Sequence, residues 1–136
     1  MPDTLTLDEL HEAAARLWAE LPAGATLWLS GDLGAGKTTF VQALARAAGA
    51  ESARSPSFAL VHEYHGPEGI IAHADCYRLQ SPDEAIHLDL GELERNARLL
   101  VVEWPERAGE DAPDPEVHIR LGHAEDPDLR TLEYVR

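Results

Sequence analysis

Apolar residues recur every three or four positions in two segments, a spacing that places their side chains on one face of a helix. The first segment begins at Thr6, which forms a capping-box pattern with Glu9, and it runs to about Leu21. The second spans residues 37–48 and ends at Gly49, a residue favoured just after helix C-termini. The apolar faces consist of Leu10, Ala14, Leu17 and Leu21 in the first helix and of Phe40, Val41, Leu44, Ala45 and Ala48 in the second. We expect the second face to pack on a β-sheet.

Shorter apolar or alternating runs predict β-strands. These runs are residues 27–29, 58–64, 70–74, 99–102, 117–121 and 131–135. Turn residues at 66–69 are expected to join two of them as a hairpin. The run 99–102 is wholly apolar and suits a central parallel strand, whereas 131–135 is expected to form a final edge strand.

The remaining segments carry helix-start and loop signals. Ser81 and Pro82 are typical of the N-cap and first position of a helix. Residues 105–116 are rich in proline and acidic side chains, which predicts a loop. The whole pattern predicts one α/β domain over residues 1–136, with a mixed β-sheet flanked by helices.

Composition and charge restrict the possible partners. The 136 residues include 25 acidic and 11 basic side chains, which gives a formal net charge of −14. A chain this acidic is expected to repel nucleic acid unless another protein supplies a basic surface. It contains no apolar run near the roughly 20 residues of a membrane-spanning helix, no signal-peptide pattern and a single cysteine, Cys76. We therefore expect a cytoplasmic protein without a disulfide or a membrane partner.

Residues 31–38 carry the most specific signal in the chain. They read Gly-Asp-Leu-Gly-Ala-Gly-Lys-Thr and match the P-loop pattern G-x-x-x-x-G-K-[ST] in full. The loop lies between a predicted strand and a predicted helix, an arrangement that directs backbone N–H groups and the positive helix end at phosphates. The expected fold class is therefore a P-loop NTPase-like domain.

Each residue of the loop has an expected role. Glycine at positions 31, 34 and 36 allows the backbone to approach an anion closely. Lys37 is expected to lie between the β- and γ-phosphates, Thr38 to give its hydroxyl to Mg²⁺, and Thr39 to contact the α-phosphate. The expected nucleotide contacts are Gly34, Ala35, Gly36, Lys37, Thr38 and Thr39. ATP is the expected nucleotide, because the guanine-reading motif Asn-Lys-x-Asp needs a lysine outside the loop and Lys37 is the only lysine.

Two carboxylates follow predicted strands and are candidates for catalysis. Glu103 ends the apolar run at the strand end where ligands bind in open α/β sheets, so we expect it to hold Mg²⁺. Asp75 follows the strand 70–74 and could help to hold Mg²⁺ or orient the attacking water. The alternative for both is an ordinary solvated carboxylate. Trp104 could cover a nucleotide or a partner, or simply be buried, and His73 with Asp75 lacks a third ligand for zinc.

Four motifs, in this order and spacing, resemble the TsaE (YjeE) family of small P-loop ATPases. They are residues 31–40 (GDLGAGKTTF), 55–58 (SPSF), 73–79 (HADCYRL) and 102–105 (VEWP). The family acts in bacterial threonylcarbamoyladenosine modification of tRNA. The resemblance implies an ATPase that binds ATP and Mg²⁺, is slow alone, and is stimulated by partner subunits.

The resemblance also implies partners and residue roles. The partners are TsaD, which transfers the threonylcarbamoyl group, and TsaB, and tRNA is reached only through their complex. The ATP cycle would reset or regulate this complex. Carried over, Lys37 and Thr38 serve phosphate and Mg²⁺, Glu103 is a Mg²⁺ ligand and Asp75 a catalytic or switch carboxylate. Residues 55–58 correspond to a switch-like segment, and adenine contacts fall near residues 6–10.

Two other functions fit a P-loop. A small-molecule kinase usually closes an arginine-bearing lid over its acceptor, and between residues 85 and 99 the chain offers only Arg95 and Arg98. A nucleotide-dependent scaffold would bind ATP without useful turnover. The kinase is distinguished from the ATPase by its phosphoryl acceptor, which is a metabolite and not water. The scaffold is distinguished from the ATPase by whether ATP hydrolysis, and not only ATP binding, is needed for sustained modification.

Overall fold

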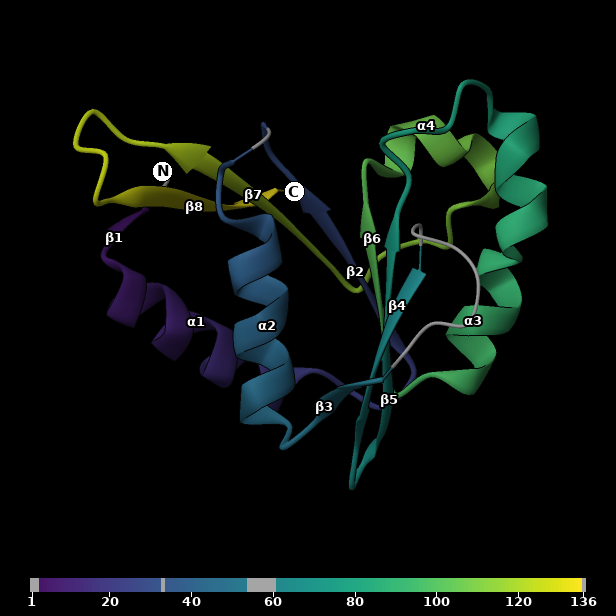
Figure 1. The fold of residues 1–136 in the computed structure, drawn as a ribbon, viewed down its shortest axis with the longest axis horizontal. Helices are drawn as coiled ribbons and strands as arrows, with labels where there is room; N and C mark the ends of the chain where they lie inside the picture. The colour runs from purple at the N-terminus through teal and green to yellow at the C-terminus, as the bar shows by residue number, and fades with distance from the viewer. Residues whose placement is uncertain (1–2, 33, 54–60, 136) are drawn as a thin grey trace.

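The described strands form one mixed sheet that runs through the middle of the molecule (Figure 1). The computed structural model describes residues 3–32, 34–53 and 61–135. Across the sheet the strands follow the order β1-β8-β7-β2-β6-β5-β4-β3. In chain order they are β1 (Asp3–Leu5), β2 (Ala25–Ser30), β3 (Glu51–Ala53), β4 (Val61–Gly66), β5 (Gly69–Asp75), β6 (Leu99–Glu103), β7 (Val117–His123) and β8 (Arg130–Val135).

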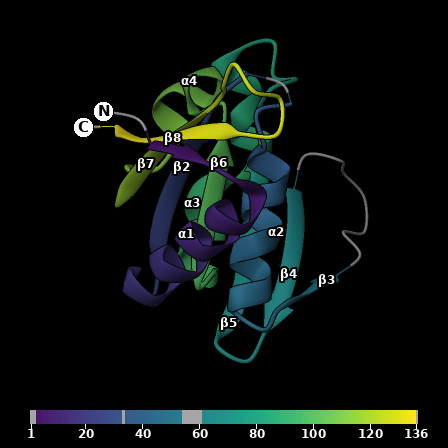
Figure 2. The ribbon, with the colours of Figure 1, turned by 90° about the vertical axis from the view of Figure 1, so that its left-hand side faces the viewer.

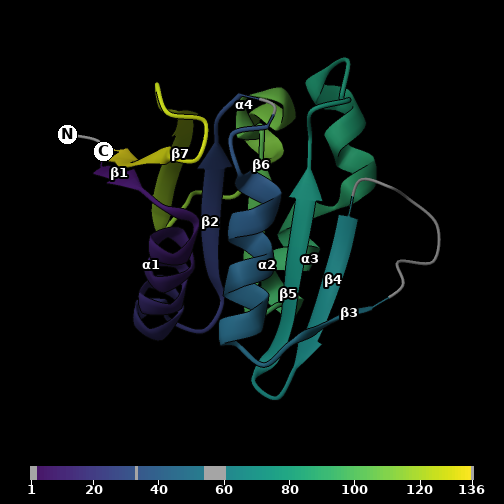
Figure 3. The same ribbon diagram turned by 60° about the vertical axis from the view of Figure 1, so that its left-hand side comes forward.

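The centre of the sheet is parallel and its flanks are antiparallel. Strands β7, β2, β6 and β5 run in the same direction, and β6 pairs with both β2 and β5. On one flank β8 pairs antiparallel with β7, and β1 pairs antiparallel with β8. On the other flank β4 pairs antiparallel with β5, and β3 pairs antiparallel with β4. Because the four central strands end at the same edge, the residues that follow them meet there, as Figure 3 shows for the tops of β2 and β5.

Helices cover the sheet in two separate layers. α1 (Leu7–Glu20) and α2 (Lys37–Ala47) pack side by side on one face, as Figures 2 and 3 show. The other face is covered by α3 (Leu90–Asn96), α4 (Pro105–Ala108) and the 3₁₀ helices η1 (Pro82–Leu88) and η2 (Gly109–Asp111). Apolar residues on alternate positions of the strands fill two cores, one beneath each layer. The mixed sheet flanked by helices is therefore confirmed.

The strongest local patterns formed the predicted elements. Thr6 accepts a hydrogen bond from the Glu9 amide, and the Glu9 side chain bonds the Thr6 amide, so the capping box opens α1. All five residues of the predicted apolar face of α2 are buried. Strand β6 is buried along its whole length between two parallel neighbours. The hairpin is confirmed as β4 and β5, which meet at Gly66 and Gly69.

Several predictions about the edges and connections were wrong. β8 is an inner strand, because β1 pairs with it and takes the edge position. The loop expected over residues 105–116 begins instead with α4 and η2, because Pro105 occupies the first helical turn, where its missing N–H costs nothing. By contrast, the helix start predicted at Ser81 and Pro82 is confirmed, because Ser81 is the N-cap of the 3₁₀ helix η1.

Part of the predicted site falls on residues that the structure does not describe. The switch-like segment 55–58 and Leu33 of the loop lie outside the described residues. Within the described part of the chain, none of the helices combines the length and apolar composition needed to cross a lipid bilayer.

Candidate functional site

The glycine-rich loop connects the end of β2 to the start of α2. Gly31 follows β2 with a φ of +146°, and a Cβ there would lie 2.3 Å from the Leu121 carbonyl oxygen on β7. The close approach of β7 thus requires glycine at position 31, in addition to any part that this residue plays in binding an anion. Gly36 caps α2 in the left-handed region, with a φ of +101°, a conformation in which a side chain is strained. The loop can therefore reach its turn only with glycine at these positions.

The N-terminus of α2 is suited to bind an anion. The first amides of a helix have no carbonyl partner within it, and they carry the positive end of the helix dipole. Gly36 supplies no side-chain cap, and the first turn of α2, described in full, contains no acidic residue. The amides of Lys37, Thr38 and Thr39 thus form an electropositive helix end.

Lys37 is held at the centre of the loop by three contacts. Its Nζ donates a hydrogen bond to the Gly31 carbonyl at 2.6 Å and lies 3.5 Å from Glu103 Oε1. The same ammonium lies 4.5 Å from the centre of the Trp104 ring. Lysine is rarely buried without partners, yet Lys37 is only 6% exposed. These contacts therefore fix a buried positive charge between the Gly31 carbonyl and Glu103.

Glu103 is the buried counter-charge of Lys37. It is the last residue of β6 and is only 4% exposed. Its Oε2 accepts a short hydrogen bond from His73 Nε2 on the neighbouring strand β5. Burial alone raises the pKa of Glu103, but the hydrogen bond and charge of His73, together with the Lys37 ammonium, outweigh this effect, so that the pKa is lowered. Glu103 is therefore ionised at neutral pH, as a metal ligand must be.

Asp75 and Trp104 complete the edge of the site. Asp75 is the register partner of Glu103, so the two carboxylates end adjacent parallel strands. Asp75 Oδ1 accepts a hydrogen bond from the Tyr77 amide at 3.0 Å, which fixes its orientation. Trp104 has a φ of +55°, a strained backbone conformation for a bulky residue, and its ring lies 5.0 Å from that of Tyr77. Strain of this kind is concentrated at functional sites.

The predicted residues converge on a single cavity of about 290 Å³. Its lining residues are Gly34, Gly36, Lys37, Thr38, Thr39, Asp75, Glu103, Trp104 and Arg130. All predicted nucleotide contacts except Ala35 are among them, and the Ala35 side chain is buried in the core. Arg130, at the start of β8, was not predicted, because it carries no motif and reaches the site only through the sheet topology.

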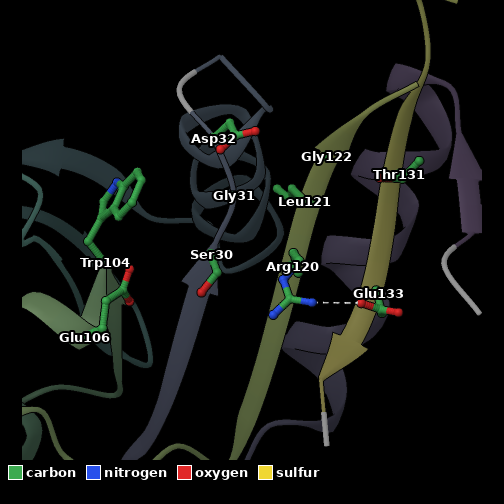
Figure 4. A pocket seen from close by; sticks show the side chains of 10 residues that line it. All are labelled: Ser30, Gly31, Asp32, Trp104, Glu106, Arg120, Leu121, Gly122, Thr131 and Glu133. Atoms are coloured by element: carbon green, nitrogen blue, oxygen red, sulfur yellow. Dashed lines mark hydrogen bonds and ion pairs between the residues drawn. The ribbon is translucent and has the colours of Figure 1, made fainter. Parts of the chain in front are cut away.

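Trp104 also lines a second pocket, together with Ser30 and Gly31 at the end of β2 (Figure 4). It is larger, about 380 Å³, and extends along β7 and β8. Its arginine, Arg120, is paired with Glu133 across these strands at 3.2 Å. The lining of this pocket lacks Lys37, Thr38 and both strand-end carboxylates. We therefore assign the candidate site to the smaller cavity.

The residues of the smaller cavity fit a phosphate chain and a magnesium ion. Helix amides and an ammonium are typical phosphate ligands. Mg²⁺ is usually held by one or two carboxylates together with phosphates and water, so a complete protein cage is unnecessary. The Thr38 hydroxyl and the ionised, buried Glu103 carboxylate are suitable donors.

Comparison with known proteins identifies the family of this chain. A family model described as "Threonylcarbamoyl adenosine biosynthesis protein TsaE" matches residues 4–131. The chain belongs to the TsaE family. This confirms the resemblance inferred from the four motifs, and it places the protein in threonylcarbamoyladenosine biosynthesis.

TsaE proteins from several bacteria are similar over most of their length. The protein named tRNA threonylcarbamoyladenosine biosynthesis protein TsaE from Aquifex aeolicus is 37% identical over 103 residues, 74% of this chain and 72% of the relative. The Bacillus subtilis protein of the same name is 35% identical over 120 residues, 87% of this chain and 75% of the relative. The crystal structure of Bacillus subtilis YdiB is similar with a TM-score of 0.69 and 29% identity, covering 98% of this chain and 86% of YdiB.

Proposed function

We propose that this TsaE-family protein binds ATP with Mg²⁺ and hydrolyses it, and that this cycle regulates or resets the tRNA-modifying complex. The observation that carries the proposal is the buried pair of Lys37 and Glu103 beneath the N-terminus of α2. A positive and a negative group are held together there, and both line a polar cavity. These are the charges that a triphosphate and its metal ion require.

The loop and α2 would bind the phosphates. Lys37, Thr38 and Thr39 at the start of α2 line the cavity, and their amides, which have no carbonyl partner within the helix, can donate hydrogen bonds to phosphate oxygens. The Lys37 ammonium, held between the Gly31 carbonyl and Glu103, is placed to contact the β- and γ-phosphates. Because these donors are fixed in advance, they can stabilise charge that develops on the phosphates without reorganisation.

Thr38 and Glu103 would hold the metal ion, and Asp75 would act on water. Bound Mg²⁺ supplies neutralisation of charge on the β- and γ-phosphate oxygens. Asp75 ends β5 next to Glu103 and lines the same cavity, so it is positioned to orient the attacking water. In this proposal Lys37, Asp75 and Glu103 are the catalytic residues.

A neighbouring hollow would receive the nucleoside. It has a volume of about 350 Å³ and shares Gly36, Thr39 and Arg130 with the phosphate cavity. Its remaining lining residues are Leu7, Leu10, Pro127 and Asp128. Leu7 is 56% exposed, and an exposed leucine next to a glycine-rich loop is suited to contact the face of a base. This supports adenine binding near residues 6–10.

The partners would be TsaD and TsaB. A protein with a net charge of −14 is a poor ligand for tRNA, but it is suited to subunits that carry a basic surface. In this arrangement tRNA is bound by the complex and this protein supplies the nucleotide cycle. Transfer of the threonylcarbamoyl group would remain with TsaD.

Reconstitution tests the proposal. Phosphate release from ATP is measured for this protein alone, with TsaD and TsaB, and with each partner separately. We expect slow Mg²⁺-dependent release alone and faster release with the partners. The absence of release in all mixtures would contradict the ATPase, and phosphoryl transfer to a metabolite in place of water would favour a kinase.

A further inference from the structure

His73 is a buried polar residue that the chemistry of ATP does not by itself require. It lies in β5 on the same side of the sheet as Asp75 and is only 5% exposed. Burying an imidazole costs free energy unless its nitrogen atoms find partners. Its Nε2 contacts Glu103 Oε2, so this ring nitrogen is directed at the candidate metal ligand.

The two oxygens of Glu103 therefore have different partners. Oε2 accepts the hydrogen bond from His73, and Oε1 lies 3.5 Å from the Lys37 ammonium on the cavity side. Because an ionised carboxylate can only accept, His73 must donate through its Nε2–H. This hydrogen bond restricts rotation of the carboxylate and keeps Oε1 near Lys37, which lines the cavity.

We propose that His73 is a positioning residue, which holds Glu103 in the orientation needed to bind the metal ion of the Mg²⁺–nucleotide complex. The inference rests on the proposed function. Groups that hydrogen-bond a metal ligand from behind fix its orientation, and their removal typically lowers metal affinity or activity about 10- to 100-fold. His73 bears this relation to Glu103 without lining the cavity itself.

A structural role makes a different prediction. If His73 served only to fill the core, its loss would weaken metal-free and metal-bound nucleotide binding together, because both depend on an intact loop. If His73 is a positioning residue, its loss weakens only the metal-dependent part of the nucleotide affinity, because the amides of α2 and Lys37 would bind phosphate without Mg²⁺. The ratio of the two affinities therefore separates the roles.

The experiment compares His73→Leu and His73→Gln with the wild type. His62→Gln is the matched control, because His62 is the register partner of His73 on β4, with ring centres 6.4 Å apart, and is exposed. Affinity for a non-hydrolysable ATP analogue is measured by calorimetry in EDTA and in Mg²⁺. Affinity for Mn²⁺ in the presence of the analogue is measured by electron paramagnetic resonance.

We expect His73→Leu to bind the analogue in EDTA within about twofold of the wild type and to bind Mn²⁺ about 10- to 100-fold more weakly. His73→Gln keeps a side-chain N–H donor and should recover part of this loss, and His62→Gln should match the wild type. Unchanged Mn²⁺ affinity in both His73 variants, or equal losses with and without metal, would overturn the inference. A wild type that binds the analogue in neither buffer would instead contradict the proposed function.

Discussion

Two ion pairs lie near Gly31, with similar distances between nitrogen and oxygen but opposite degrees of burial. Lys37 and Glu103 are 3.5 Å apart, with side chains that are each 6% exposed. Arg120 and Glu133 are 3.2 Å apart, with side chains that are 56% and 35% exposed. The first pair lines the candidate site and the second lines the neighbouring pocket. Distance alone does not distinguish them, but burial does.

Burial changes what an ion pair indicates. An exposed pair contributes about 0–1 kcal/mol and is screened by salt. A buried pair has lost its hydration, and this cost is offset only by good geometry and further hydrogen bonds. Lys37 and Glu103 have such support, from the Gly31 carbonyl and from His73 respectively. A buried ion pair that lines a cavity costs free energy of desolvation and therefore points to function. Arg120 and Glu133 form an ordinary exposed ion pair and give no such indication.

Removal of the buried cation should have the largest effect. In Lys37→Ala the ammonium that neutralises phosphate charge is lost, so we expect turnover to fall on the order of 10²–10³-fold and triphosphate binding to be lost. Phosphate release and calorimetry measure the two effects. Near-normal hydrolysis by this variant would reject the role of Lys37.

Removal of the buried carboxylate charge should affect Mg²⁺-dependent turnover more strongly than ATP binding. Glu103→Gln keeps the shape of the side chain but loses the charge that supports Mg²⁺, so turnover should fall on the order of 10²-fold. ATP binding should change less, because the amides of α2 remain. Equal losses in both measurements would identify Glu103 as a structural residue.

The pH dependence of stability should follow the buried carboxylate. Because the pKa of Glu103 is lowered from its ordinary value of 4.5, its contribution to stability is complete above that pH and is lost as the pH falls through the lowered pKa. We expect the free energy of unfolding of the wild type, relative to Glu103→Gln, to stay constant from pH 7 down to about pH 4.5 and to decrease below that pH. Urea unfolding at several pH values tests this. A difference that stays constant down to pH 3 would be inconsistent with the buried pair.

Arg130 should have a smaller effect, because it lies at the rim of the cavity and is partly exposed. In Arg130→Gln a positive charge near the phosphates is lost, and a contribution of up to about 1 kcal/mol corresponds to an affinity about threefold to fivefold weaker. Calorimetric titration with ATP and Mg²⁺ measures it. A loss as large as that in Lys37→Ala would place Arg130 among the primary phosphate ligands.

The exposed pair should have the smallest effect. Arg120→Gln should change the free energy of unfolding by less than about 1 kcal/mol and leave ATP affinity unchanged. Urea unfolding and calorimetry test both statements. A strong loss of nucleotide affinity would transfer the binding site to the pocket of Figure 4.

The elements around the site could be predicted because their local signals agree with their environment. Strand β6 is buried on both faces, so its sequence is wholly apolar. The side chains of Thr6 and Glu9 each accept a hydrogen bond from the other residue's backbone amide, so the start of α1 does not depend on contacts with distant segments. The glycine-rich loop combines a motif with a strand before it and a helix after it.

The remaining features depend on contacts between distant segments. β1 has only three residues and exists because it pairs with β8 at the other end of the chain. The contact of His73 with Glu103 requires that β5 lie beside β6 in one particular register. Arg130 reaches the cavity because the sheet returns β8 past the start of α2. No local pattern contains this information.

The most direct test of the central claim is a crystal structure with Mg²⁺ and a non-hydrolysable ATP analogue. We predict the β- and γ-phosphates at the N-terminus of α2, in contact with the Lys37 ammonium, and the metal ion between Thr38 and Glu103. Phosphates bound in the pocket along β7 and β8, or a glycine-rich loop that stays empty at saturating analogue, would contradict the claim.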